Sequence, residues 1–121
     1  MRAPLVLEAK CELLFFKSQA SLESWVEPVD VMNGEYGSCW DSEGRLLQVR
    51  VHSNEERLLG LLRRRVERVV VTPAEDVPHH LPQLHQALLG FLLKLNLEAR
   101  MPTSGDTSEL LDLAIEYSGV L

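Results

Sequence analysis

The chain lacks several features on which membrane proteins and disulfide-bonded proteins depend. Only two of its 121 residues are cysteines, Cys11 and Cys39, and two thiols without a secretory leader are expected to stay reduced. No apolar run approaches the roughly 18 residues that span a bilayer. Glu8, Lys10 and Glu12 interrupt the apolar N-terminal stretch, which argues against a signal peptide. We therefore expect a cytoplasmic protein that does not contact a membrane.

Motifs for catalysis are also missing. Ser38 lacks the motif that places a hydrolase nucleophile on a sharp turn, and no sequence signal places a histidine beside Cys39. No glycine-rich phosphate loop is present. Neighbouring carboxylates such as Glu55 and Glu56 are typical of solvated turns and helix starts. These absences predict a protein that is not an enzyme and needs no cofactor.

Three of the four histidines form a cluster, at His79, His80 and His85. Their spacing misses the i, i+4 pair that binds zinc on one face of a helix. With Asp76 as an added ligand, the cluster supports an alternative hypothesis, a small metal-binding or hydrolytic protein. The other interpretation is a solvated start of a helix.

Acidic residues outnumber basic residues, and the formal net charge is -6. A negative chain argues against nonspecific nucleic-acid binding, because phosphates demand a cationic surface. It is compatible with a basic protein partner, whose approach a negative surface would steer. The arginines at 63–65 are interpreted as a solvated end of a helix.

Hydrophobic periodicity and turn residues predict strands mainly in the first half of the chain and helices mainly in the second. The expected strands lie at residues 5–16, 29–32, 35–40, 47–51 and 69–71. The expected helices lie at residues 18–26, after Ser53, from 78 or 81 to 97, and at 107–117. This order predicts an α+β fold, a small antiparallel β-meander with helices packed mainly on one face. We expect one domain over residues 1–121, in which residues 101–121 form a C-terminal helical extension.

Local signals for turns and caps carry much of this prediction. Asn33-Gly34 is the strongest two-residue hairpin signal, because both residues tolerate positive φ. Gly44 is suited to the left-handed position that closes a second turn, residues 41–44. Ser53 and Glu56 form a capping box, which predicts a helix.

Three aromatic residues stand near these turns, Trp25, Tyr36 and Trp40. Trp25 belongs to the core if its helix packs under the sheet. Tyr36 and Trp40 share strand parity and therefore a face of the sheet. They are either core residues or aromatic anchors on an exposed face, a residue type that is common at interface hot spots.

Residues 13–49 combine a strand ending in Phe16, a Ser18-capped helix and three short motifs. The motifs are Val-Glu-Pro-Val-Asp-Val at 26–31, Asn-Gly-Glu-Tyr at 33–36 and Asp-Ser-Glu-Gly-Arg at 41–45. In these elements the chain resembles a group of small bacterial proteins, some of which look like immunity proteins of polymorphic-toxin systems. The resemblance implies a protein that binds and neutralises a cognate toxin domain. It supplies no catalytic residue.

We therefore expect a non-enzymatic binding protein that blocks a basic toxin domain with an acidic surface. The candidate contact residues are Asp30, Glu35, Asp41 and Glu43, because the two turns and their flanks should be exposed. A regulatory or structural homodimer, formed through a sheet edge or the C-terminal helix, is a further alternative.

Overall fold

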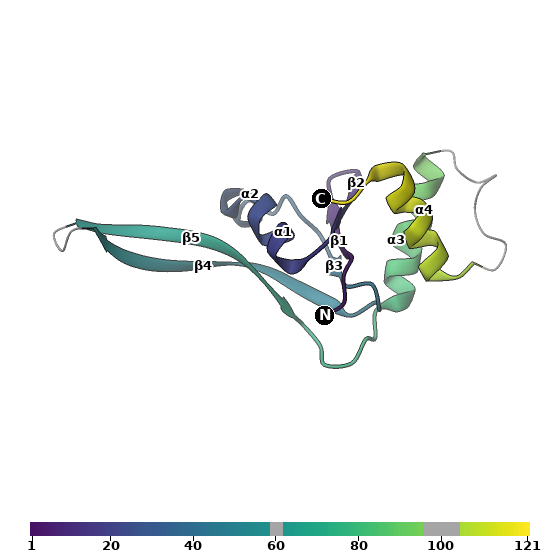
Figure 1. Ribbon diagram of the computed structural model, residues 1–121, viewed down its shortest axis with the longest axis horizontal. Coiled ribbons are helices and arrows are strands. Elements are labelled where there is room, and N and C mark those ends of the chain that lie inside the picture. Colours follow the sequence, from purple (N-terminus) through teal and green to yellow (C-terminus); the bar gives the residue numbers. More distant parts are fainter. Residues whose placement is uncertain (59–61, 96–104) are drawn as a thin grey trace.

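One antiparallel sheet of five strands organises the described part of the chain (Figure 1). The computed structural model describes residues 1–58, 62–95 and 105–121, and it describes side chains outside residues 56–64 and 96–104. The elements are β1 (Leu5–Ala9), β2 (Glu12–Phe16), α1 (Gln19–Trp25), α2 (Pro28–Met32), β3 (Cys39–Trp40), β4 (Leu46–Leu58), β5 (Leu62–Pro73), α3 (Leu81–Lys94) and α4 (Thr107–Ser118). The strand order is β2-β1-β3-β4-β5. The expected α+β class is confirmed.

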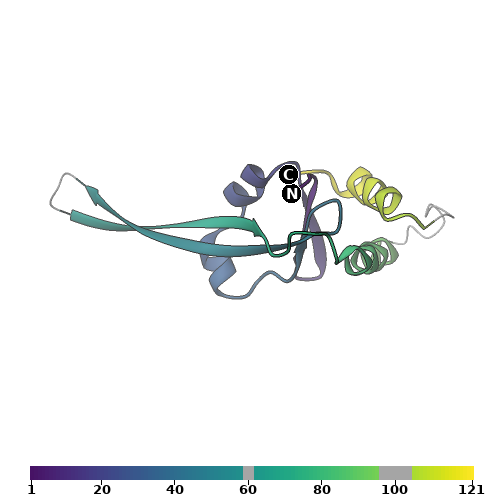
Figure 2. The ribbon, with the colours of Figure 1, turned by 90° about the horizontal axis from the view of Figure 1, so that it is seen from below.

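Strand β1 is buried on both faces of the sheet. Leu5 and Leu7 pack with Leu22 of α1 on one face, and Val6 packs with Leu84 and Leu88 of α3 on the other. Side chains of a strand alternate between faces, so a continuous apolar run is typical of a strand covered twice. The helices therefore divide between the two faces instead of gathering mainly on one, with α1 and α2 on one side and α3 and α4 on the other (Figure 2).

Helix α1 begins as expected and also closes a sheet edge. Ser18 Oγ accepts a hydrogen bond from the Ser21 N–H at 3.1 Å, and Ser21 Oγ accepts one from the Ser18 N–H at 3.2 Å. Farther along the helix, Gln19 Nε2 donates to the Val71 carbonyl at 3.0 Å, and Glu23 accepts from the Val71 N–H at 2.8 Å. These two bonds satisfy backbone groups at an edge of β5, where unpaired groups would invite pairing with another strand.

The strand expected at 29–32 and the hairpin expected at Asn33-Gly34 are wrong, because this segment is helix α2. Pro28 occupies the first helical turn, where its missing N–H costs no hydrogen bond. Asn33 caps the C-terminal end of α2, and Gly34 follows with φ +70°. Tolerance of positive φ favours a hairpin turn, but the same tolerance also allows a residue to follow the end of a helix, and this is the role of Gly34.

The helix expected after Ser53 is also wrong, because β4 continues to Leu58 and pairs along its whole length with β5. Ser53, the expected cap, lies opposite Glu67. Glu55 lies opposite Arg65, and a cross-strand pair of opposite charge stabilises a sheet. The arginines at 63–65 accordingly lie on β5 and not at the end of a helix. The long β4–β5 hairpin projects beyond the helices (Figure 1).

Helices α3 and α4 pack together and cover the second face. Asp106 caps α4 by accepting a hydrogen bond from the Ser108 N–H at 3.1 Å, and α4 ends before Gly119, as expected. Leu110 and Ala114 of α4 are buried beside Leu88 of α3, so α4 contributes to the core. The expected end of the longer helix at Leu97 and the expected linker at 101–104 lie outside the described residues. No helix in the described ranges combines the length and apolar character that crossing a bilayer requires.

The turn at 41–44 forms as expected and docks on the start of α3. Gly44 has φ +84°, and a Cβ built on it would overlap the backbone of Leu81. The Gly44 carbonyl accepts a hydrogen bond from the His80 N–H at 3.0 Å. Only glycine combines this conformation with this close approach.

We predict that Gly44→Ala destabilises the protein by about 2 kcal/mol or more, because an L-residue in the left-handed region costs ~1–2 kcal/mol before any clash. Gly90→Ala is the matched control. Its Cβ would meet nothing within 4 Å, and the change should stabilise α3 by about 0.5–1 kcal/mol. Urea unfolding of both variants checks the prediction, which fails if Gly44→Ala is as stable as the wild type.

Candidate functional site

Asp41, one of the four predicted contact residues, is fully buried and cannot belong to a binding surface. Its carboxylate accepts hydrogen bonds from the N–H groups of Glu43 and Arg45, both at 2.9 Å, and from the Arg2 N–H at 3.2 Å. The Arg45 guanidinium lies 3.1 Å from the same carboxylate. Asp41 therefore holds the turn and the N-terminal segment together, because its short side chain satisfies backbone N–H groups that the turn leaves unpaired.

The other three predicted residues divide into two places. Glu43 is exposed, and its carboxylate lies 3.6 Å from the guanidinium of Arg2. Asp30 on α2 and Glu35 after α2 are connected by a hydrogen bond from the Glu35 N–H to the Asp30 carbonyl at 3.0 Å, and both line the same hollow. The structure thus brings together Asp30 and Glu35 only.

Aromatic side chains share this hollow, which has a volume of about 330 Å³. Trp25 and Tyr36 line it beside the two carboxylates, and Lys10 and Glu12 enter from the β1–β2 turn. Trp25 is 48% exposed, so its expected place in the core is wrong. Its ring meets the ring of Phe16 edge-on, at 5.7 Å between centroids, and this contact fixes the exposed indole on the surface.

The hollow around Tyr36 has a negative potential. Burial raises the pKa of the Tyr36 hydroxyl, and the carboxylates of Asp30, Glu27 and Glu35 raise it further. Each of these carboxylates disfavours a second negative charge at the ring. The same field attracts a cationic group of a partner.

A second hollow, of about 480 Å³, extends from Tyr36 and Glu35 to Glu8 on β1. Glu8 points to the same face as Val6, because strand residues two apart share a face. Its carboxylate lies directly over Gly37, where any Cβ would collide with it. The sequence contained a signal for this residue, since Glu8 is the one charge in an otherwise apolar strand.

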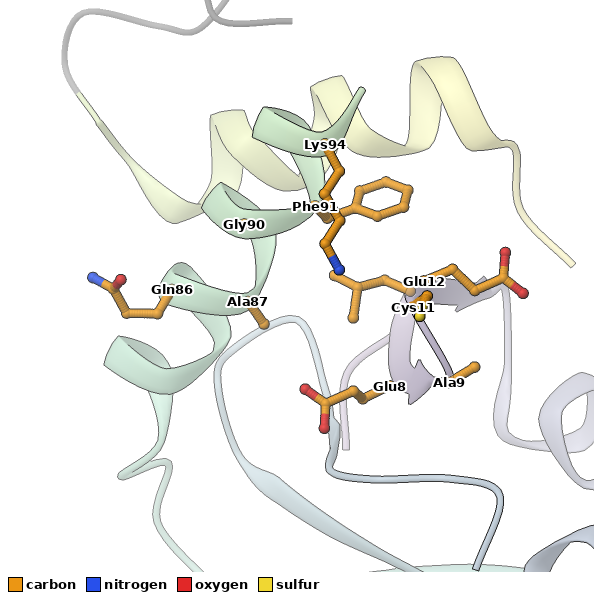
Figure 3. Close-up of a pocket in the computed structure, with 10 residues that line it drawn as sticks. Glu8, Ala9, Cys11, Glu12, Gln86, Ala87, Gly90, Phe91 and Lys94 are labelled. Carbon is orange, nitrogen blue, oxygen red and sulfur yellow. The ribbon is translucent and has the colours of Figure 1, made fainter. Parts of the chain in front are cut away.

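From Glu8 a groove continues along helix α3 (Figure 3). One part, of about 260 Å³, is bordered by Glu12, Phe91 and Lys94. The other, of about 540 Å³, is bordered by Trp40 and Gln83. The two parts share Glu8, Gln86 and Ala87, so we treat them as one feature, the α3 groove.

Trp40 is a core residue and not an exposed anchor, since it is only 3% exposed. It packs with the α3 side of the sheet, whereas Tyr36 packs against the cluster on the other side, so the expectation that the two share a face is wrong. It nevertheless lines the α3 groove. Its indole Nε1–H is buried and has no hydrogen-bond partner among the described residues. A buried donor without a partner lowers the free energy of unfolding by roughly 1–3 kcal/mol. An acceptor that reached this N–H would therefore be stabilised by it.

The hollows and the α3 groove form a continuous surface around the β1–β2 turn, which we call the acidic belt. Its carboxylates come from Glu8, Glu12, Asp30 and Glu35. The lysines that line it are Lys10 and Lys94. Charge and exposed aromatic surface therefore coincide in one region of the fold.

The histidine cluster does not form the site that the metal-binding alternative requires. His80 Nδ1 lies 2.9 Å from both carboxylate oxygens of Glu75, whereas His85 is hydrogen-bonded to Thr107 Oγ1 on α4 at 2.9 Å. His79 and Asp76 are exposed. Within the ranges that the structure describes, no three His, Cys, Asp or Glu side chains come close enough together to hold a metal ion.

The two cysteines are free thiols, Cys11 exposed and Cys39 buried. Burial raises the pKa of the Cys39 thiol to about 12, the charge of Asp41 adds to this effect, and a hydrogen bond from the Trp40 backbone opposes it. A thiol with such a pKa is protonated at neutral pH and is a poor nucleophile. Cys39 therefore adds no reactive group to the region.

Glu75 joins the start of β4 to the start of α3. One of its oxygens accepts hydrogen bonds from the Leu46 N–H at 2.9 Å and the His79 N–H at 3.0 Å. Burial tends to raise the pKa of this carboxyl, but the hydrogen bonds from His79, Leu46 and His80 lower it to about 2. Because these donors favour the charged form, the network stabilises the fold only while Glu75 is ionised.

We predict that Glu75→Gln reduces the acid sensitivity of folding. The folded-state pKa is depressed from 4.5 to about 2, so the stabilisation is complete above pH 4.5 and is lost as the pH falls towards 2. The stability difference between wild type and variant should therefore shrink through this window in urea unfolding at stepped pH. Asp76→Asn, at an exposed neighbour, should leave the wild-type slope unchanged. An unaltered slope in Glu75→Gln would contradict the prediction.

We predict that Asp41→Ala lowers the free energy of unfolding by about 3–5 kcal/mol, the usual cost of removing one partner from a buried ion pair. Glu43→Ala should cost less than about 1 kcal/mol, because an exposed ion pair contributes little. Thermal and urea unfolding of the two variants provide the comparison. Equal losses would mean that Asp41 does not hold the turn.

Comparison with known proteins identifies no relative of this chain. No protein-family model, no curated protein and no solved structure matches the chain. What bears on function is therefore the geometry of the acidic belt itself.

Proposed function

We propose that this chain is a non-enzymatic binding protein of the immunity type, which neutralises a bacterial toxin domain by covering it with the acidic belt. The observation that carries the proposal is the convergence of Asp30, Glu35 and Glu27 around Tyr36, beside the half-exposed Trp25. Tryptophan and tyrosine are enriched at the centres of protein interfaces. Carboxylates around them select a basic partner and speed its approach.

The distribution of charge supports a basic partner. The segment 52–68 of the β4–β5 hairpin contains five arginines and three glutamates, a net charge of +2. The rest of the chain contains seven basic and fifteen acidic residues, a net charge of -8. The two parts together give the overall charge of -6. The body of the protein, where the belt lies, is more acidic than the net charge suggests. Such a field attracts cations over about one Debye length, ~8 Å at physiological salt.

The proposed mode of action is steric and electrostatic. The partner's cationic groups would meet Asp30 and Glu35, and an apolar side chain beside them would pack on the indole of Trp25. Two residues of the metal-binding alternative have other partners in the structure, since His80 is hydrogen-bonded to Glu75 and His85 to Thr107, and this proposal gives that cluster no role. In this proposal the protein acts in the cytoplasm, where it would protect the cell that makes the toxin.

We predict that the double change Asp30→Lys with Glu35→Lys weakens binding to a toxin domain that the wild type binds by at least about tenfold, which corresponds to 1.4 kcal/mol. Like charges placed across an interface disfavour the complex. The matched control is Asp112→Lys on α4, an exposed position that should leave affinity within about twofold. Calorimetric titration gives both values.

Two outcomes would contradict the proposal. The first is an unchanged affinity of the double variant for a toxin domain that the wild type binds. The second is a bound toxin domain whose activity the wild-type protein does not reduce. Circular dichroism of each variant shows whether a loss of binding comes from a loss of folding, since Glu35 is exposed but Asp30 is half-buried.

A further inference from the structure

We infer that the α3 groove binds an extended segment of the partner protein, whose backbone carbonyl accepts the hydrogen bond of the Trp40 indole and whose basic side chain pairs with Glu8. The inference rests on the proposed function, because it names the part of a basic partner that would enter the acidic belt. It concerns a different place from Asp30 and Trp25. The two places can therefore be tested separately.

The length of the groove suits an extended peptide. Its wall is one face of α3, formed by residues three and four apart from Gln83 to Lys94, which is the spacing of a single helix face. At 1.5 Å per residue this face is roughly 16 Å long. An extended chain advances about 3.3 Å per residue, so the groove has room for about five residues. Gly90 leaves the wall open, since nothing lies within 4 Å of a Cβ built there.

The hydrogen-bonding groups of the groove match a peptide with a basic side chain. The indole N–H of Trp40 is buried and has no acceptor among the described residues. Gln83 and Gln86 line the same part of the groove at exposed positions of α3, so a carbonyl would reach the indole once these flexible side chains move aside. A peptide supplies such an acceptor in every residue. The side chain of an arginine could not accept the indole hydrogen bond, because a guanidinium has donors only.

Glu8 supplies the second half of the recognition. Its carboxylate is partly buried at the junction of the α3 groove and the hollow that leads to Tyr36. The weak contact of 3.4 Å with the Ser38 N–H leaves most of its accepting capacity unused among the described residues. A carboxylate in such a position forms a strong, charge-assisted hydrogen bond with arginine or lysine.

We test the inference by NMR with N-acetyl-arginine methylamide as the probe. The protein has two tryptophans, so its spectrum contains two indole N–H signals, and Trp25→Phe assigns them. We expect the arginine probe to shift the Trp40 signal in a saturable way. N-acetyl-citrulline methylamide, which has the same shape without the charge, should bind several-fold more weakly. Glu8→Gln should abolish this difference between the two probes, and Asp112→Asn should preserve it.

A second variant, Gly90→Leu, tests the inference independently in case Glu8→Gln does not fold. Gly90→Leu narrows the part of the groove between Glu8 and Phe91 from an open helix position. It should weaken the shift of the Trp40 signal, because the basic side chain can no longer reach Glu8, while the rest of the spectrum stays folded. A shift of the Trp25 signal alone would overturn the inference and leave the proposed function standing. No shift of either signal, or equal binding of both probes, would also overturn it. Failure to neutralise the toxin, with the Trp40 shift intact, would instead count against the proposed function.

Discussion

The buried carboxylate of Asp41 is the constraint on which the arrangement of the whole molecule depends. It accepts hydrogen bonds from the N-terminal segment at Arg2 and from its own turn at Glu43 and Arg45. The carbonyl of Gly44 in the same turn accepts a hydrogen bond from the His80 N–H, which places the start of α3 against the turn. A buried charge is stable only when it is paired and hydrogen-bonded, so all of these segments must be in place together.

The acidic belt follows from this arrangement. Because α3 is docked at its start by the turn and packed along its length against β1 and β2, one face of the helix stands beside Glu8 and Trp40 and forms the wall of the α3 groove. On the other side of the β1–β2 turn, α2 carries Asp30 to the edge of Tyr36. The fold therefore concentrates carboxylates and aromatic rings in one region and leaves the carboxylates fully or partly exposed.

The errors of the sequence-based interpretation share one cause. Asn33-Gly34 has the left-handed freedom that both a hairpin turn and a helix end require, and only the packing of α2 against β4 and β5 decides between them. Ser53 and Glu56 have the spacing of a capping box, yet the partner strand β5 pairs with this segment. A strand is stabilised by its neighbours across the sheet, which local sequence does not reveal. Asp41 was misplaced for the same reason, because a polar residue in a turn is normally solvated.

The sequence by itself determined the α+β class, the Ser18 cap, the turn at 41–44 and the start and end of α4, since each depends on residues that are close neighbours in the chain. It also predicted an acidic protein, and it identified Asp30 and Glu35 as candidate contact residues. Tertiary structure alone decided that α2 is a helix, that β4 and β5 form one long hairpin, that Asp41 is buried and that Glu8 and Trp40 border a groove. These features arise from contacts between segments distant in sequence, such as β1 with α3, and their energies depend on burial and register, which appear only when the chain is folded.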